Sequence, residues 1–236
     1  MNMPDEYYIK NLYPFQDGII KIIKSTPTPF YLTGGTILGR HYFNHRYSDD
    51  LDFFVNFDKN YRQYVRDIID KLEKYQTDSS YLINKDKIVA EESFTQITIT
   101  QQFSDNGTEL KIDLINDVSE RFGQVLWDNK FGKIDNVKNI LCNKLTALYR
   151  LEPKDIADIW IISKNTNFDW NEIVDCSKRK EVGIDILKLS EIIETFPIDY
   201  IDIIKWINRI DASEFIKDLN IISDDIFNGR KNSLCL

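Results

Sequence analysis

Hydrophobic and polar residues alternate along several short segments in the first half of the chain, and this period of two is typical of β-strands with one buried face. The alternation is most regular at 94–101 and 109–117. The strands predicted in this half cover residues 30–32, 50–54, 80–83, 88–90, 94–101 and 109–117. The predicted helices cover residues 6–25, 36–43 and 61–75, and a hairpin turn is predicted at Asp105-Asn106-Gly107.

The second half of the chain has a different pattern, in which hydrophobic residues recur every three or four positions as in amphipathic helices. Pro153 fits the first turn of a helix, and Pro197 separates two helices. The predicted helices cover residues 137–151, 154–164, 170–179, 184–195, 198–209 and 213–227. The pattern therefore predicts an α+β protein with an α/β domain at 1–135 and a helical domain at 136–236.

Two acidic residues interrupt the apolar character of the strand predicted at 50–54. Asp50 and Asp52 are two positions apart and therefore project from the same face, whereas Leu51 and Phe53 point into the core. Two neighbouring carboxylates repel each other and weaken a strand. A divalent cation bound by oxygen ligands is the simplest group that would neutralise them.

A third carboxylate, Asp113, is embedded in the strand predicted at 109–117. Three acids on neighbouring strands can hold a pair of Mg²⁺ ions about 3.5–4 Å apart, as in enzymes that transfer phosphoryl or nucleotidyl groups. Gly34 and Gly35 directly follow the first predicted strand and open a helix. Glycines let the backbone approach a bound group, and the free N–H groups at the start of a helix favour phosphate. Together these features predict metal-dependent transfer from a nucleoside triphosphate.

Three charged residues of the second half stand out from the helical pattern. Lys144 falls on the apolar stripe of its helix, so it must reach solvent, pair with a carboxylate or face a site. Asp155 and Asp158 lie one turn apart on the same side of the next helix. Asp158 also follows Lys154 by four positions, so an ordinary ion pair within the helix explains it as well as a site does.

The composition narrows the range of functions without deciding among them. The chain of 236 residues has 30 basic and 38 acidic residues and a net charge of −8, which argues against a general nucleic-acid-binding surface. No apolar run approaches the roughly 20 residues of a membrane span, and the N-terminus has no signal pattern, so we expect a cytoplasmic protein without membrane contact. Three scattered cysteines argue against a disulfide framework. His41 and His45 are expected to be surface or orienting groups rather than metal ligands.

Several of these residues resemble motifs of the polymerase-β-like nucleotidyltransferase superfamily, and more narrowly of its AbiEii/AbiGii abortive-infection toxin branch. The resemblance rests on Gly34-Gly35-Thr36 and on the string that begins at His45, HRYSDDLDFF. It continues downstream with Lys144 and with Lys154-Asp155-x-x-Asp158, and it covers roughly residues 30–160.

The resemblance implies a polymerase-β-like core, which is a mixed sheet with flanking helices, followed by an all-helical half. Asp113 would be the base that accepts the proton of the attacking hydroxyl, and Asp155 or Asp158 would fill the acidic role of the last motif. The implied cofactor is Mg²⁺ or Mn²⁺, with an NTP as co-substrate. The implied site residues are Gly34, Gly35, Thr36, Arg46, Ser48 and Lys144 for the NTP, Asp50, Asp52 and Asp113 for the metal, and Asp50, Asp52, Asp113, Lys144, Asp155 and Asp158 for catalysis.

The resemblance also implies a biological role. The chain would transfer a nucleotide from an NTP to a macromolecule, with tRNA as the acceptor, and would act as the toxin of a toxin–antitoxin or phage-defence pair with a cognate antitoxin. Two alternatives remain open. Small-molecule antibiotic nucleotidyltransferases carry a similar pattern of glycines and acids, and an acidic protein suits a cationic aminoglycoside. The other alternative is a non-catalytic binding module of the same fold.

Overall fold

The computed structural model describes residues 6–76, 81–102 and 107–235 and divides the chain into two compact units. The first unit consists of Met1–Ile37, Ser48–Val118 and Gln124–Asp135. The second unit consists of Leu38–Tyr47, Ser119–Gly123 and Asn136–Leu236. The last passage of the chain from the first unit to the second follows residue 135. Two short segments, at 38–47 and 119–123, also group with the second unit.

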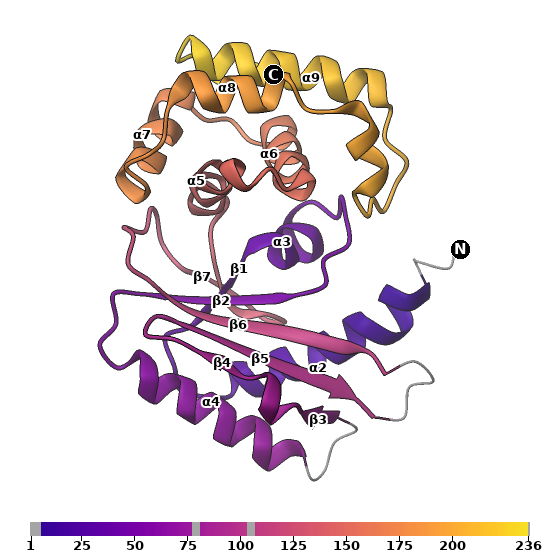
Figure 1. Ribbon diagram of the computed structural model, residues 1–236, viewed down its shortest axis with the longest axis vertical. Helices are drawn as coiled ribbons and strands as arrows, with labels where there is room; N and C mark the ends of the chain where they lie inside the picture. Colours follow the sequence, from indigo (N-terminus) through magenta and orange to yellow (C-terminus); the bar gives the residue numbers. More distant parts are fainter. Residues whose placement is uncertain (1–5, 77–80, 103–106, 236) are drawn as a thin grey trace. The chain divides into compact units, whose positions relative to one another are not determined.

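The first unit is built on one mixed β-sheet whose strands follow the order β3-β5-β6-β2-β1-β8-β7, with β4 paired to β5 (Figure 1). β2 runs antiparallel to β1 and parallel to β6. Alternate residues of β2 are buried, so Leu51, Phe53 and Val55 face the core. The strands are β1 Tyr31–Thr33, β2 Leu51–Asn56, β3 Tyr81–Ile83, β4 Val89–Ala90, β5 Phe94–Gln101, β6 Glu109–Asp117, β7 Leu126–Asp128 and β8 Gly132–Ile134.

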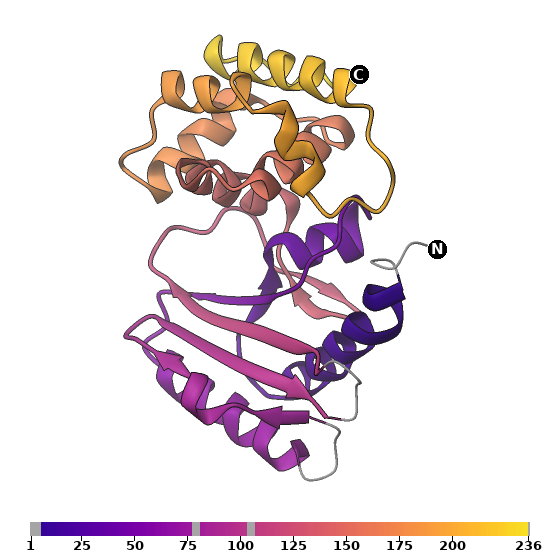
Figure 2. The ribbon, with the colours of Figure 1, turned by 45° about the vertical axis from the view of Figure 1, so that its right-hand side comes forward.

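Helices cover one face of this sheet. α2 (Tyr13–Lys24) follows a π-helical segment at Tyr8–Leu12 and packs beside α4 (Tyr61–Gln76), and both lie on the same side of the strands (Figures 1 and 2). Their inward side chains, such as Ile19 and Ile68, are buried. β1 leads directly into α3 (Gly34–Ile37), so the backbone turns from strand to helix at the glycine pair.

The second unit is helical. α5 contacts α6 and α7, and α8 contacts α9. Four helices of this unit begin with an N-cap residue whose side chain accepts a hydrogen bond from a backbone N–H group of the first turn. These residues are Asn136, Asp169, Asp185 and Asp211. The elements are a π-helical segment at Leu38–Tyr42, α5 Val137–Ala147, α6 Pro153–Asn165, α7 Trp170–Lys180, α8 Ile186–Glu194, α9 Ala212–Phe227 and 3₁₀ segments at Leu148–Arg150 and Ile198–Ile203. A mixed sheet with flanking helices and a helical C-terminal region confirm the predicted fold class.

One predicted helix is wrong. Residues 198–209 contain only the 3₁₀ segment Ile198–Ile203, and the residues after it pair with a distant segment instead. The N–H group of Ile207 donates to the carbonyl oxygen of His45 at 3.0 Å, and Arg46 forms a β-bridge with Trp206. This pairing takes the place of helical hydrogen bonds. The spacing of hydrophobic residues within 198–209 cannot reveal a pairing with a distant segment.

The remaining differences are small. β7 and β8 were not predicted, and they have only three residues each. The helix predicted at 137–151 ends in a 3₁₀ turn, after which Leu151 has a φ of 57°. The turn predicted at 105–107 and the first residue of the strand predicted at 80–83 involve residues outside the described ranges. Within those ranges, no helix combines the length and the apolar character needed to cross a bilayer.

Candidate active site

Asp52 and Asp113 lie side by side on neighbouring parallel strands. In the register of the sheet, Asp52 of β2 pairs with Asp113 of β6 on one side and with Thr33 of β1 on the other. Both acids are half-buried and alternate with buried apolar residues, so they share the face opposite the core side chains. Asp50 is also half-buried and comes two residues upstream, just before β2 begins. The first unit therefore gathers these acids on one part of its sheet.

Gln96 of β5 fixes the orientation of Asp113. The two residues pair across the antiparallel strands β5 and β6, and the Nε2 group of Gln96 donates to Oδ1 of Asp113 at 2.9 Å. This hydrogen bond restricts the orientation of the carboxylate of Asp113. A fixed orientation is what a general base needs in order to reach the proton of a substrate.

Gly34 provides the space that Asp52 occupies. Its φ is +71°, a conformation that L side chains rarely adopt, and a Cβ atom built there would lie 2.4 Å from Oδ2 of Asp52. The carboxylate of Asp52 thus lies against the backbone of the glycine turn, where no other residue type would leave room for it. Thr36, two residues later, donates its hydroxyl to the carbonyl oxygen of Asp50. The turn and the acidic segment are therefore held together.

The donor set of this region fits Mg²⁺ supplied together with a nucleotide. Among the described residues, no three His, Cys, Asp or Glu side chains converge closely enough to form a complete metal site by themselves. Mg²⁺ is commonly held by one or two carboxylates, water and substrate phosphates rather than by an all-protein cage. Asp50 and Asp52 would be those carboxylates, and the close approach of Asp52 to Gly34 places its oxygen beside the turn expected to bind phosphate.

The second unit contains a separate cluster of buried charges around Asp158. Arg46 forms a bidentate pair with Asp158, with Nε to Oδ1 and Nη2 to Oδ2 both at 2.7 Å. Nε2 of His45 lies 2.8 Å from Oδ1 of Asp158. Asp158 is fully buried, and both partners are buried. Lys154, which the sequence offered as an ion-pair partner of Asp158, does not belong to this cluster. The ion pairs of Asp158 instead anchor the segment 38–47 to α6.

Lys144 of α5 extends this cluster to Asp155. Its Nζ atom lies 2.6 Å from Oδ2 of Asp158 and 2.7 Å from Oδ1 of Asp155. Asp155 also pairs with Nε of Arg150 at 2.7 Å. The lysine on the apolar stripe therefore pairs with carboxylates of the next helix, which was one of the three options that its position left open.

The opposite charges of the cluster stabilise one another's ionised forms. Burial works against the ionised form of Asp158, but the positive charges of Arg46 and Lys144 outweigh it and hold the pKa of Asp158 well below its usual value. Burial alone would lower the pKa of Lys144, whereas Asp158 and Asp155 raise it above the ordinary value. Burial also lowers the pKa of His45, against the opposing effect of Asp158. The network is thus an ionised triad of Arg46, Asp158 and Lys144 beside a neutral histidine.

The predicted site residues divide between the two units. Gly34, Gly35, Thr36, Ser48, Asp50, Asp52 and Asp113 belong to the first unit, and Arg46, Lys144, Asp155 and Asp158 belong to the second. Sequence reasoning did not identify Gln96 or Gln16, which contact the acidic segments from other elements. Neither glutamine belongs to a motif, and only the tertiary contacts reveal them.

The sequence of residues 24–202 matches the family model described as "Nucleotidyl transferase AbiEii toxin, Type IV TA system". This match covers more than half of the 236 residues. The chain belongs to the AbiEii family. It is therefore related to nucleotidyltransferase toxins of toxin–antitoxin systems, as the motifs at Gly34 and Asp50 predicted.

Two solved structures from Helicobacter pylori share the fold of this AbiEii-family chain. JHP933 has a TM-score of 0.61 and 19% identity, with 92% of this chain and 91% of that chain covered. A candidate nucleotidyltransferase has a TM-score of 0.63 and 18% identity, with 93% and 96% covered. No curated protein sequence matches the chain significantly.

Proposed function

We propose that this AbiEii-family chain transfers a nucleotide from an NTP to an RNA acceptor, with the 3′ end of tRNA as its target, and that Mg²⁺ or Mn²⁺ is required. The observation that carries the proposal is the juxtaposition of Asp52 with Asp113 in the sheet register and with Gly34 at the turn. The chain also has a cognate antitoxin in this proposal, because the family belongs to toxin–antitoxin systems.

In the proposed reaction the residues of the first unit carry the chemistry. Asp50 and Asp52 would hold the metal ion, which would supply neutralisation of charge on the triphosphate. The acceptor hydroxyl attacks the α-phosphate, a new phosphodiester bond forms, and the bond to the β-phosphate breaks with release of pyrophosphate. The backbone at Gly34 and Gly35 and the hydroxyl of Ser48 bind the phosphates, and Thr36 fixes Asp50. Asp113, oriented by Gln96, accepts the proton of the attacking hydroxyl.

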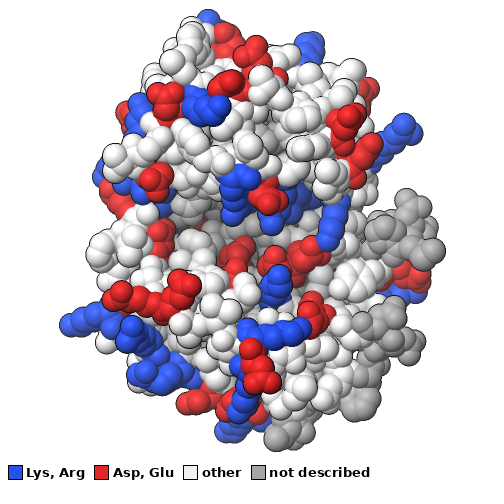
Figure 3. Space-filling model, viewed as in Figure 1, with Lys and Arg blue, Asp and Glu red and all other residues white. Residues whose placement is uncertain are grey.

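The charged residues of the second unit have a different part in this proposal. Asp155 and Asp158 form the ion pairs that hold Lys144, and Arg46 pairs with Asp158. The resemblance to the family motif assigns Lys144 to the triphosphate. Acidic and basic side chains are interspersed on the face of the molecule shown in Figure 3, so neither unit presents a continuous basic surface there. The acceptor RNA is therefore expected to be recognised locally rather than by overall charge.

The test is a transfer assay. Protein incubated with each labelled NTP, Mg²⁺ and total RNA should label RNA, and Asp50→Ala should reduce the transfer by about a thousandfold or more, because loss of metal stabilisation costs several kcal/mol. Asp70→Ala, at an exposed acid of α4, is the matched control and should leave the transfer unchanged. Absence of label with all NTPs, or transfer that survives Asp50→Ala, would contradict the proposal. Label on an added aminoglycoside but not on RNA would assign the acceptor to small molecules.

A further inference from the structure

Side chains of the N-terminal helix hold the backbone that leads into the acidic strand. Gln16 of α2 is fully buried, and its Nε2 group donates to the carbonyl oxygens of Ser48 at 3.2 Å and Asp49 at 2.9 Å. These residues precede β2, so hydrogen bonds of the sheet ladder do not hold them. One neutral amide thus connects α2 to two successive peptide groups.

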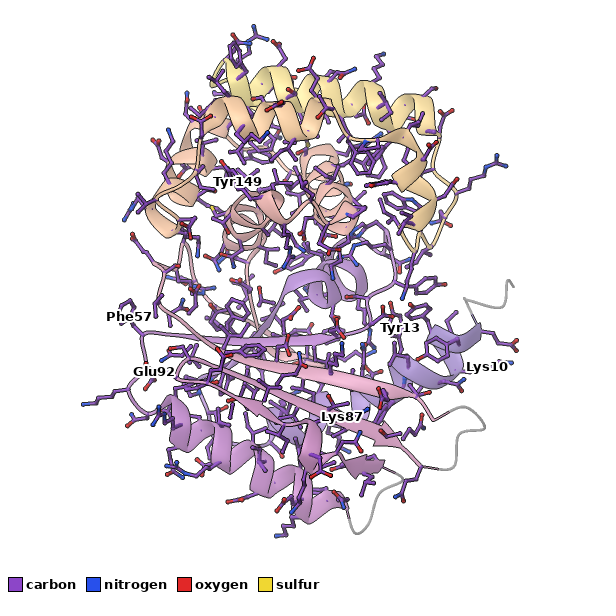
Figure 4. The ribbon with its side chains drawn as sticks, viewed as in Figure 1. Lys10, Tyr13, Phe57, Lys87, Glu92 and Tyr149 are labelled. Carbon is purple, nitrogen blue, oxygen red and sulfur yellow. The ribbon has the colours of Figure 1, made fainter. Side chains whose placement is uncertain are left out.

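Neighbouring side chains hold the same segment from other directions. Tyr8 donates its hydroxyl to Oδ1 of Asp49 at 2.6 Å. Tyr13, labelled in Figure 4 in the first turn of α2, accepts the N–H group of Ser48 at 3.4 Å. Thr36 binds the carbonyl oxygen of Asp50. Three successive carbonyl oxygens, at residues 48, 49 and 50, therefore each accept a bond from a side chain.

Tyr8 binds the carboxylate of Asp49, which is not proposed to bind metal, and the other contacts act on the backbone of the acidic segment. The path of residues 48–50 sets the direction in which Asp50 projects and the point at which β2 begins, at Leu51, one residue before Asp52. Asp52 in turn pairs with Asp113, the proposed proton acceptor. Mg²⁺ requires near-ideal octahedral geometry, so a small displacement of either carboxylate weakens binding. The family match begins at residue 24, and Gln16 lies before it.

We propose that Gln16 is a positioning residue for the metal-binding carboxylates of this chain, and that the helix upstream of the family match thereby forms part of the active-site scaffold. This inference rests on the proposed function of Asp50 and Asp52. The residue type is suited to the role, because an uncharged amide can donate to two carbonyl oxygens without placing a charge in the core. An apolar side chain of similar length would leave both carbonyl oxygens without this donor.

The test compares Gln16→Met with Tyr81→Phe. Tyr81 donates its buried hydroxyl to the carbonyl oxygen of Leu72 at 2.7 Å, so its variant removes a buried bond in the same unit without touching residues 48–52. Binding of the Mn²⁺ complex of a non-hydrolysable NTP analogue to the protein is measured by electron paramagnetic resonance, and amide exchange of residues 48–53 is measured without metal. Nucleotide transfer is measured as a function of Mg²⁺ concentration.

Gln16→Met should raise the dissociation constant for the Mn²⁺–nucleotide complex about tenfold, as loss of a group that orients metal ligands commonly does. It should also speed amide exchange at 48–53 and shift the Mg²⁺ requirement of transfer upward, so that excess Mg²⁺ restores part of the activity. Tyr81→Phe should change each value less than about twofold. If Gln16→Met does not fold, Gln16→Asn, which retains the amide on a shorter side chain, should show the same changes at smaller size.

Equal effects of Gln16→Met and Tyr81→Phe would overturn the inference, because the change would then reflect general loss of stability. Unchanged Mn²⁺ binding and exchange in a folded Gln16 variant would overturn it as well. A wild-type protein that neither binds Mn²⁺ nor transfers a nucleotide would refute the proposed function, and the exchange rates at 48–53 would still decide whether Gln16 holds this segment.

Discussion

Asp52 in the first unit and Asp158 in the second are both acidic residues of the family motifs, and the structure supports them in different ways. Upstream of Asp52, Gln16 and Thr36 hold the backbone by donating to the carbonyl oxygens of Ser48, Asp49 and Asp50. Around Asp158, they bind the carboxylate itself, through Arg46 and Lys144. Asp52 is half-buried, whereas Asp158 is fully buried.

The difference separates two uses of a carboxylate. A buried acid whose two oxygens are both paired with cations of the protein maintains structure, because its charge is already compensated. An acid that is placed by its backbone and remains reachable from solvent can exchange its partners for a metal ion and phosphate. We therefore propose that Asp158 belongs to the scaffold of the second unit and that Asp52 takes part in the proposed reaction.

Asp158→Asn gives the largest expected effect on stability. The substitution leaves Arg46 and Lys144 buried with one compensating charge fewer, and breaking such a network typically costs about 3 kcal/mol or more. For a chain of this size, each 1 kcal/mol corresponds to a shift of about 2–4 °C in Tm. Urea unfolding followed by circular dichroism measures the change in the free energy of unfolding.

Asp52→Asn is the matched control for this measurement. It removes one of two adjacent half-buried carboxylates, so it relieves repulsion with Asp113 and should change the free energy of unfolding by less than about 1 kcal/mol. Equal losses of unfolding free energy in the two variants would contradict the assignment of a structural role to Asp158 and not to Asp52.

Gly34 in the first unit and Gly39 in the second allow the two regions to be compared by the same substitution. A Cβ atom at Gly34 would lie 2.4 Å from Oδ2 of Asp52, and one at Gly39 would lie 2.5 Å from the carbonyl oxygen of Arg46. Gly34→Ala should displace the carboxylate of Asp52 and lower the proposed nucleotide transfer about 10- to 100-fold, with a loss of stability near 1 kcal/mol from the positive φ. Gly39→Ala should disturb the segment that carries Arg46.

The measurements for this pair are transfer activity and Tm on the same preparations. Gly39→Ala should lower Tm more than Gly34→Ala does, since its clash is with backbone and the neighbouring Arg46 anchors Asp158. Gly34→Ala should lower activity more at a temperature where both variants are folded. The reverse order of either effect would contradict the assignment of the two glycines to different roles.

The sequence was informative wherever structure follows from local spacing. The alternation of Asp50, Leu51, Asp52 and Phe53 was enough to place the acids on the face opposite the core, and β2 has that pattern of burial. The break at Gly34 likewise marked the turn from strand to helix. These features depend on neighbours within a few residues, which is the range that periodicity reports.

Contacts between distant residues could not be predicted in this way. Arg46 and Asp158 are 112 positions apart, and their bidentate pair joins two motifs that the sequence suggested only as separate candidates. Gln16 is a polar residue near an isoleucine-rich stripe, and its spacing does not show that it meets Ser48 and Asp49. The helix predicted at 198–209 failed for the same reason, because Ile207 pairs with His45 instead.

His45 gives the smallest effect, a dependence of stability on pH. Burial lowers its pKa, and Nδ1 of its ring has no hydrogen-bond partner in the described part of the chain. As the pH falls through about 6.5, His45 in the unfolded chain binds a proton more readily than His45 in the folded protein does, so stability should decrease.

His45→Gln can still donate a hydrogen bond to Asp158 but cannot titrate. Between pH 7 and 5.5, the wild type should therefore lose more of its unfolding free energy than His45→Gln does, as measured by urea unfolding at both values. Parallel pH profiles of the two proteins would show that the histidine beside Asp158 is protonated equally in both states, and the buried network would then include a third cation.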